Sequence, residues 1–411
     1  MVPRVNSEHV FQVRPYIDEL RGCAGLLLAS AIGLTAGMTA TLFYSLGAFI
    51  PPLQAEFGWS RGDISLAASL LTMAVFVTGT LAGRLCDRFG AALVGALSLL
   101  GYGLAVILMA VVVGDIVQFW VAYFVIAVLG VGSTPIVLVR PITTFFVRAR
   151  GIALGIALTG AGIAGFWVPR LVAVVTEVYG WREAYMALAV IAILAAPVVW
   201  FGFRAIPART ATESSSGGRG ISHGEARQTR VYWLLSLMAL TMALGIAGVI
   251  VHLIPLFSDL GAGAVEAAKI ASIIGISSVV GRLGIGVALD HIPCTQVSIG
   301  VMVLAAVGIL LLWGFGLEYA VLATILIGLA AGAEIDLLAY LTVSFFGHGH
   351  YGAIYGWQYS VFALGYGFSP YLIGVLYGFS GAYQAPLLAS ALLLGCAAFI
   401  CLWLRKPALC R

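Results

Sequence analysis

The chain has 411 residues, of which 62% are hydrophobic and only 9% carry a charge. This composition excludes a soluble globular domain, whose surface needs many more charged side chains. The formal net charge is +4, and the basic residues require no nucleic-acid partner, because membrane topology accounts for where they lie.

Largely uncharged apolar stretches recur along the whole chain. A helix needs about 20 such residues to cross a lipid bilayer. We therefore predict an all-α integral membrane protein with twelve transmembrane helices. Their expected ranges are 23–50, 64–81, 91–113, 116–139, 152–176, 184–203, 231–257, 267–288, 297–315, 319–344, 353–376 and 383–404.

The basic residues predict the topology. The first 22 residues are polar and lack the apolar core and cleavage site of a secretory signal. With the N-terminus inside, 16 of the 21 Lys and Arg residues fall in cytoplasmic segments. Because positively charged loops stay on the cytoplasmic side, we expect both termini there. The expected location is a cell membrane, with a bacterial inner membrane as the first choice.

One long polar segment, residues 204–230, divides the chain and contains the run SSSGG, which is typical of a flexible linker. Six predicted helices precede it and six follow it. We therefore predict an N-terminal six-helix bundle (1–203), a cytoplasmic linker (204–230) and a C-terminal six-helix bundle (231–411).

The two halves also repeat each other. Gly83 and Asp87 recur as Gly286 and Asp290, 203 residues later, and further matches have offsets of 200 to 203. An ordered, nearly constant offset indicates duplication. Two pseudo-symmetric bundles around a central cavity are the architecture of secondary transporters.

Residues 83–90, GRLCDRFG, follow the second predicted helix. They resemble the signature that the major facilitator superfamily carries between its second and third helices, although two alanines replace its last two basic residues. The resemblance implies a cytoplasmic gate, in which glycine permits close helix approach and aspartate interacts with a helix N-terminus. We assign this gate to Gly83, Asp87, Arg88, Gly90 and, in the second half, Asp290.

Two further segments narrow the resemblance. Residues 145–155, FFVRARGIALG, and 56–63, EFGWSRGD, resemble segments of the monocarboxylate transporter and oxalate/formate antiporter families. The resemblance implies a secondary carrier that moves a small organic anion by alternating access and works as a monomer without a cofactor. The six cysteines have no metal-ligand spacing, so no metal site is expected.

Arg282 is the most informative single residue. It lies in the apolar stretch 267–288, whose only other charge is Lys269. An arginine at membrane depth costs at least a few kcal/mol, so it faces a cavity or a partner. An anionic substrate and a structural ion pair both fit. Its spacing of eight residues before Asp290 resembles the family's carboxylate-binding arginine, although Ser278 replaces the acid found four positions earlier in monocarboxylate transporters.

The eleventh predicted helix bears on the charge of the substrate. Gln358 occupies the position where the resemblance to the oxalate carrier implies a second cation. One arginine balances one carboxylate, whereas a dianion leaves a charge uncompensated in a low-dielectric cavity. We therefore predict a monoanion. Tyr355 and Trp357 are candidates for shaping the pocket, with ordinary helix packing as the alternative.

Two carboxylates lie at membrane depth in the tenth predicted helix. Glu334 and Asp336 are two residues apart, so they point to different faces. One of them is expected to pair with Arg282 and to take up a proton when substrate displaces it. Glu334 is the first candidate for this proton coupling and Asp336 the second. A permanent interhelical salt bridge is the equal alternative.

Three more polar residues are candidates for contacts within the membrane. His252 is a candidate substrate contact or proton relay, with a hydrogen bond to a neighbouring helix as the stronger alternative. Tyr44 is a candidate donor to a carboxylate from the opposite half, with packing as the alternative. Arg170 is expected to extend to the outer surface.

Two other functions compete with a proton-coupled carrier of organic anions. A carrier of the same fold could export a hydrophobic, drug-like or siderophore-like compound, but this function would not need Arg282. A membrane-embedded enzyme would need clustered nucleophiles, metal ligands or paired acids, and the sequence shows none. The sequence also lacks a phosphate-binding loop for ATP.

Overall fold

The computed structural model describes residues 19–146, 150–204, 221–347 and 350–404, which are almost entirely helical. The helices of the first half are α2 (Ala24–Ala36), α3 (Met38–Phe57), α4 (Arg61–Phe89), α5 (Ala91–Val112), α6 (Ile116–Gly130), η1 (Val131–Ser133), α7 (Pro135–Leu138), α8 (Arg140–Phe145), α9 (Arg150–Val178) and α10 (Trp181–Arg204). Those of the second half are α11 (His223–Gln228), α12 (Arg230–Asp259), α13 (Ala264–Ala271), α14 (Ile273–His291), α15 (Cys294–Phe315), η2 (Gly316–Tyr319), α16 (Ala320–Phe346), α17 (Tyr351–Ser380) and α18 (Gln384–Leu402).

The number of membrane crossings follows from the lengths of these helices. Eleven stretches of the described chain are long and apolar enough to cross a bilayer. One of them, Cys294–Phe346, has 53 residues and contains both α15 and α16, which pack against each other. Since one crossing takes about 20 residues, this stretch crosses twice. The predicted all-α membrane protein with twelve crossings is confirmed.

The first and fourth crossings are interrupted, which the apolar pattern did not predict. Gly37 separates α2 from α3 with an extended backbone, ψ 148°. The fourth crossing breaks at η1, where the Ser133 hydroxyl accepts a 3.1 Å hydrogen bond from the freed amide of Met38. A side chain on Gly37 would collide with the Ser133 carbonyl. The break in the fourth crossing therefore supplies a partner for an amide freed by the break in the first, where no water is available.

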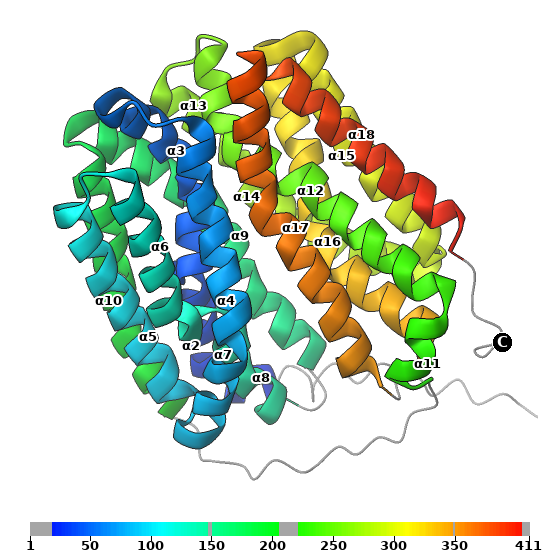
Figure 1. Ribbon diagram of the computed structural model, residues 1–411. Helices are drawn as coiled ribbons and strands as arrows, with labels where there is room; N and C mark the ends of the chain where they lie inside the picture. The colour runs from blue at the N-terminus through cyan, green and yellow to red at the C-terminus, as the bar shows by residue number, and fades with distance from the viewer. Residues whose placement is uncertain (1–18, 147–149, 205–220, 348–349, 405–411) are drawn as a thin grey trace, which may run out of the picture.

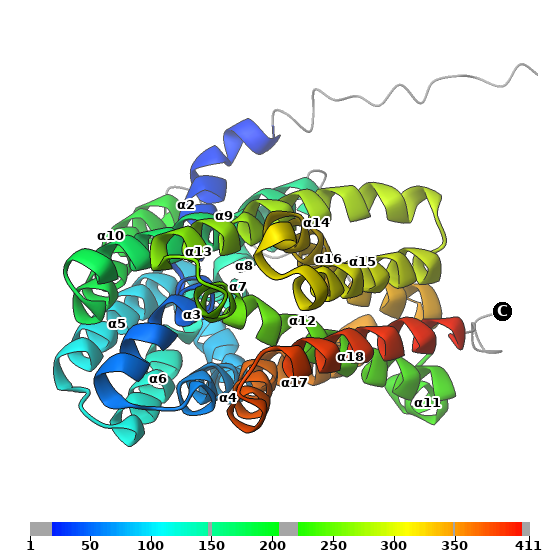
Figure 2. The ribbon, with the colours of Figure 1, turned by 90° about the horizontal axis from the view of Figure 1, so that it is seen from above.

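The helices form two bundles, α2–α10 and α12–α18 (Figure 1). Seen from above, the two bundles lie side by side, with α12 near the middle of the molecule (Figure 2). Between the bundles, the second crossing (α4) packs on the eleventh (α17), and the fifth (α9) packs on the eighth (α14). The second crossing corresponds to the eighth, and the fifth corresponds to the eleventh. The two contacts are therefore equivalent, and the architecture is pseudo-symmetric, as the sequence repeat predicts.

The two ends of the molecule differ. The linker end carries Arg204 and α11, which flank residues 205–220, and the closed end carries the turns after α3, α12 and α17 (bottom and top of Figure 1). Among the described residues, the hydrogen bonds between the bundles come from Arg61, Ser65, Ser69 and Arg170 of the first bundle. All four lie between the closed end and the middle of their helices, so the bundles are joined there.

Glycines let the bundles approach to backbone contact at this end. A Cβ on Gly374 of α17 would lie 2.6 Å from the nitrogen of Gly62 in α4. A Cβ on Gly275 of α14 would collide with the backbone of α9 at Gly162 and Phe166. Small residues at helix crossings give this close packing in membranes.

Candidate functional site

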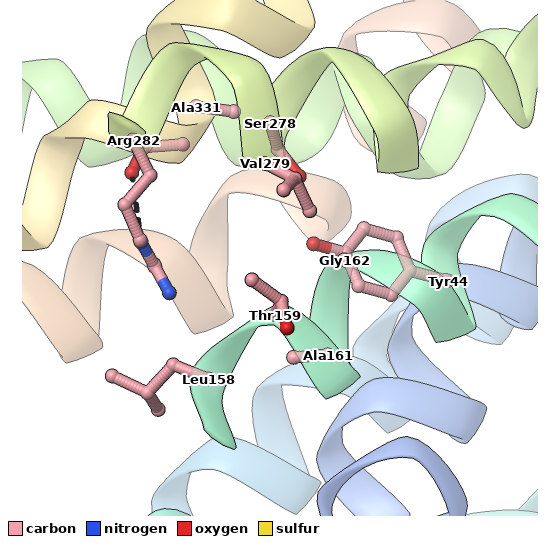
Figure 3. A pocket seen from close by; sticks show the side chains of 10 residues that line it. Tyr44, Leu158, Thr159, Ala161, Gly162, Ser278, Val279, Arg282 and Ala331 are labelled. Atoms are coloured by element: carbon pink, nitrogen blue, oxygen red, sulfur yellow. Dashed lines mark hydrogen bonds between the residues drawn. The ribbon is translucent and has the colours of Figure 1, made fainter. Parts of the chain in front are cut away.

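A cavity of about 50 Å³ lies between the bundles. Four helices line it, α3 and α9 from the first bundle and α14 and α16 from the second (Figure 3). Its polar side chains are Tyr44, Thr159, Ser278 and Arg282, and the other lining residues are apolar or glycine. Arg282 is the only ionisable cation among these residues, so the described cavity has one positive centre.

Arg282 reaches the cavity from the middle of its helix. It precedes the last residue of α14, His291, by nine residues, or roughly 14 Å of helix. Figure 3 shows the side chain extending from α14 across the cavity toward Leu158 of α9. The side chain is 24% exposed, so solvent reaches the guanidinium. Arg282 is therefore distant from both ends of α14 and borders the cavity.

The tight packing of α14 on α16 determines which group Arg282 contacts. A Cβ on Gly281 would collide with the carbonyl of Leu329, and one on Gly332 would collide with the carbonyl of Ser278. Because these positions lack side chains, the helices approach closely and Arg282 Nε donates to the Gly332 carbonyl at 3.3 Å. Among the described residues, neither terminal nitrogen of Arg282 has a hydrogen-bond acceptor.

Of the two acids in α16, Asp336 is the one that pairs with Arg282. Its Oδ2 lies 3.1 Å from Arg282 Nε, and its side chain is 38% exposed. The Nε–H points to Gly332 instead, so Oδ2 has an ionic contact without an aligned hydrogen bond. This is a weak pair by the standard of arginine–carboxylate contacts, which are commonly two-pronged.

Glu334 occupies the other face of α16, as the two-residue spacing predicts. It is 1% exposed, and its Oε1 has no hydrogen-bond partner in the described part of the chain. An unpaired ionised carboxylate in such surroundings is very costly, so the neutral acid is the form that fits. Neither acid is among the residues that line the cavity, but Asp336 is partly exposed and paired with Arg282.

Tyr44 faces Arg282 from the opposite bundle. Figure 3 shows its hydroxyl directed across the cavity toward α14. The ring fits because residue 165 is glycine, where a Cβ would lie 3.3 Å from the ring. Within the described residues the hydroxyl has no hydrogen-bond partner, so it is available to a ligand.

The structure places Gln358, Trp357 and Tyr355 away from this cavity, unlike the expectation from sequence. Gln358 is fully buried and donates to the Tyr232 carbonyl at 3.0 Å. Trp357 donates to the Ser236 hydroxyl at 3.2 Å. This part of α17 packs on α12, and a buried amide bonds to the nearest free carbonyl. Gln358 and Trp357 therefore join helices within the second bundle.

The gate motif lies at the linker end and makes contacts within the first bundle. Asp87 forms an ion pair with Arg140, the first residue of α8. The Arg88 guanidinium lies 5.2 Å from the centre of the Phe89 ring. Gly90 ends α4 with φ 84°. The space around Gly83 is open, with no atom within 4 Å of a Cβ placed there, so Gly83 does not make the close helix approach that was expected. The side chain of Asp290 lies outside the described residues.

Arg61 forms a contact between the bundles that the sequence did not single out. Its guanidinium makes two parallel bonds to Asp259 of α12, at 2.7 and 2.8 Å. Its Nε donates to Gln54 at 3.0 Å, and Nη1 donates to the Tyr383 hydroxyl at 2.9 Å. The Tyr377 ring lies 4.1 Å from the guanidinium carbon. The pattern of apolar stretches placed Arg61 in a loop, where an arginine needs no partner.

His252 lies beside this contact and not in the cavity. It is 2% exposed, and both ring nitrogens have partners. Nδ1 lies 2.9 Å from the Tyr383 hydroxyl, and Nε2 lies 3.0 Å from the Pro370 carbonyl and 3.1 Å from the Ser65 hydroxyl. The interhelical hydrogen bond given as the stronger alternative is thus present. We call Arg61, Asp259, Tyr383 and His252 together the closed-end latch.

Arg170 forms a second contact between the bundles, at α9. Its Nε donates to the Ser272 hydroxyl at 2.6 Å, and Nη2 lies 3.4 Å from the Lys269 carbonyl near the end of α13. The guanidinium also covers the Phe166 ring at 4.0 Å. Arg170 therefore joins the bundles rather than only extending to the surface.

Known proteins agree with this architecture. Human monocarboxylate transporter 11 is 25% identical over 403 residues, which are 92% of this chain and 82% of that protein. The probable sulfoacetate transporter SauU of Cupriavidus necator is 27% identical over 43% of this chain and 42% of its own length. The solved structure of a bacterial homologue of the human lysosomal transporter Spinster, inward-facing and occupied, superposes with a TM-score of 0.72. It shares 15% identity and covers 95% of this chain and 97% of its own.

The match to the family covers most of the helical core. The sequence model of the Major Facilitator Superfamily matches residues 32–365, which include the cavity and the latch residues Arg61, His252 and Asp259. The relatives and the solved structures of this fold are transporters and not enzymes, which removes the membrane-embedded enzyme from consideration. The chain therefore belongs to the major facilitator superfamily of multi-pass membrane transporters.

Proposed function

We propose that this protein is a secondary active transporter that moves a small organic monoanion by alternating access, coupled to protons. The observation that carries the proposal is the geometry of Arg282. Its two terminal nitrogens have no acceptor among the described residues and face a cavity between the bundles. The guanidinium is partly exposed, so both nitrogens are open to a carboxylate, which can bind the two together.

The charges around the cavity support a single negative charge on the substrate. Arg282 and Asp336 together are neutral. A monoanion that takes the place of Asp336 at the guanidinium leaves the site neutral only if Asp336 gains a proton. A dianion would leave one uncompensated charge at membrane depth. This argument uses Asp336 where the sequence pattern favoured Glu334, because Asp336 is the accessible partner of Arg282.

Alternating access is supported by the distribution of contacts between the bundles. The described hydrogen bonds between the bundles lie toward the closed end, and the cavity lies on the linker-end side of the α9–α14 glycine crossing. Rocking the two bundles about this fixed site would expose it alternately to each side. The uneven contacts fit one of the two end states of such a cycle.

Three further parts of the proposal concern organisation. We propose bundle units at 1–203 and 231–411 joined by a linker at 204–230, and a functional monomer. We also propose that the linker end and both termini face the cytoplasm of a cell, with the bacterial inner membrane as the first location to test. Their support is the excess of Lys and Arg in the segments at that end.

Counterflow of labelled substrates in proteoliposomes tests the central assignment. We expect Arg282→Ala to reduce monocarboxylate counterflow by about 100-fold, since loss of one partner of a buried charged contact costs about 2–5 kcal/mol. Arg84→Ala, which removes an exposed arginine of α4, is the matched control and should leave transport unchanged. Normal counterflow in Arg282→Ala would refute the assignment and favour the exporter of hydrophobic compounds.

The same assay tests the substrate charge. A mono- and a dicarboxylate of matched size are compared as unlabelled competitors. We expect the monocarboxylate to compete better. The named substrate of one relative, sulfoacetate, carries two acidic groups, so a preference for the dicarboxylate is the outcome that would overturn the monoanion assignment while leaving Arg282 as the anion site.

A further inference from the structure

We propose that His252 is a buried proton-binding site that controls the closed-end latch. When His252 is neutral the latch holds the two bundles together, and when His252 is protonated the latch is released. The proposal concerns a site different from the substrate cavity and does not require that Arg282 binds substrate.

The hydrogen-bond partners of His252 fix its neutral tautomer. The Pro370 carbonyl can only accept, so the Nε2 atom 3.0 Å away must carry the hydrogen. In the neutral ring Nδ1 is then an acceptor, and the Tyr383 hydroxyl donates to it at 2.9 Å. The same hydroxyl oxygen accepts from Arg61 Nη1 at 2.9 Å. The bonds therefore run in one direction, from Arg61 through Tyr383 to His252 and on to Pro370.

This chain of bonds crosses the boundary between the bundles. Arg61 belongs to α4 of the first bundle, whereas His252 and Asp259 belong to α12 of the second and Tyr383 immediately precedes α18. The Ser65 hydroxyl of α4 adds a second crossing contact to His252 at 3.1 Å. The protonation state of the His252 ring thus determines whether the hydrogen bonds from both bundles can form at the same time.

Protonation of His252 makes these contacts incompatible. With a hydrogen on both ring nitrogens, Nδ1 can no longer accept from Tyr383, whose hydroxyl must turn away. Among the described residues, the charged and titratable groups that face the ring are Arg61 of α4, Asp259 of its own helix and Tyr383, with Tyr377 of α17 against Arg61. One carboxylate, that of Asp259, would then face two cations.

The charge imbalance has a mechanical consequence. In the latch as observed, Arg61 and Asp259 balance each other, and the arginine side chain is 10% exposed. A second positive charge in this poorly solvated place repels Arg61, and separation of the bundles relieves the repulsion by admitting water. Protons therefore favour opening of the closed end, which would couple the conformational equilibrium to pH on that side.

Spin-label distance measurements across the closed end test the proposal. Tyr179, after α9, and Phe379, near the end of α17, belong to opposite bundles and are 72% and 87% exposed. Both are replaced by labelled cysteines in a chain without its six native cysteines. In nanodiscs without substrate, lowering the pH from about 8 to about 5 should shift the population toward the longer distance.

The variants identify the residue responsible. His252→Gln keeps one donor and one acceptor but cannot gain a charge, so it should abolish the shift and stay closed at both pH values. Tyr383→Phe removes the hydroxyl that conflicts with a protonated ring, so it should reduce the shift. His291→Gln, at the linker end of α14, is the matched control and should shift as the parent does.

Two results would overturn the proposal. One is a parent protein whose distances do not change with pH, and the other is a full shift in His252→Gln. Arg282→Ala should retain the shift, because the latch does not involve the cavity. Normal counterflow in Arg282→Ala would therefore show that the substrate-site proposal has failed, whereas a parent protein without a pH shift would show that the latch proposal has failed.

Discussion

Arg61 and Arg282 each pair with a carboxylate inside the protein, yet their surroundings differ. Arg61 forms two bonds of 2.7 and 2.8 Å to Asp259 and has further partners for its other donors. Arg282 has one ionic contact of 3.1 Å to Asp336 and one bond of 3.3 Å to a backbone carbonyl. Arg61 joins the two bundles, whereas Arg282 lies beside a cavity between them.

The difference separates a structural arginine from one available to a ligand. The guanidinium has five N–H donors in a fixed plane, and a buried donor without an acceptor is costly. At Arg61 the protein supplies the acceptors, so the contact stabilises one conformation. At Arg282 most donors are unused among the described residues, so a planar anion entering the cavity would meet a prearranged partner. Three predictions test this distinction, beginning with the largest effect.

Replacing the carboxylate partner of each arginine with a neutral amide should produce the largest difference between the two sites. Asp336→Asn should abolish accumulation driven by a pH difference while leaving substrate exchange partly intact, because exchange does not need the proton to cycle. Asp259→Asn should retain pH-driven accumulation at a lower rate, because it weakens only the latch. Uptake into proteoliposomes with an imposed pH gradient, compared with counterflow, measures both.

Glu334→Gln completes this comparison. Glu334 is buried without a partner, so its neutral substitute should leave accumulation largely intact if Asp336 carries the proton. Loss of accumulation in Glu334→Gln with retention in Asp336→Asn would reverse the assignment to the order that the sequence favoured. Retention in both variants would make the two acids structural and leave His252 or the substrate as the proton carrier.

Replacing each arginine with lysine should change substrate affinity at Arg282 and closure of the latch at Arg61. Arg282→Lys keeps the charge but loses the planar pair of donors, so we expect substrate affinity to fall by about tenfold, or about 1.4 kcal/mol. Arg61→Lys should leave affinity near the parental value and increase the open population of the closed end. Competition in counterflow gives the first quantity, and the spin-label distances give the second. If both variants lowered substrate affinity equally, the proposed difference between the two sites would be contradicted.

Glycine substitutions should have the smallest effect on transport and test the packing next to the latch. A Cβ at Gly374 would meet the α4 backbone at 2.6 Å, whereas one at Gly378, a turn later in α17, would meet nothing within 4 Å. We expect Gly374→Ala to destabilise the closed end by about 1–3 kcal/mol, the usual cost of overpacking. Gly378→Ala is the control and should resemble the parent in the distance measurement and in the thermal unfolding midpoint.

The sequence predicted the fold better than it predicted the site. Apolar length determines a membrane crossing and the repeat implies two bundles, and both are properties of the chain itself. The breaks at Gly37 and η1 were not predicted, because a helix in lipid can break only where another segment supplies partners. Here the partner of Met38 is Ser133, 95 residues away.

Of the residues that the sequence singled out for their depth in the membrane, the structure brings together only some. Arg282 and Tyr44 face the same cavity from opposite bundles, and Asp336 pairs with Arg282. Gln358 was not placed correctly, because its depth says nothing about the direction in which its side chain leaves α17. The sequence did not identify Arg61 as a contact between the bundles, because its acceptors come from three other segments of the chain.

By itself the sequence determined that this chain spans a membrane twelve times in two related halves and keeps an arginine at membrane depth. These properties follow from the free energy of transferring each residue from water to lipid, which does not depend on the fold. Only the tertiary structure decided which charges meet. An arginine can bond through most of its donors, as Arg61 does, or keep free donors beside a cavity, as Arg282 does. Which of these occurs depends on helices far apart in the sequence and on the glycines that let them approach.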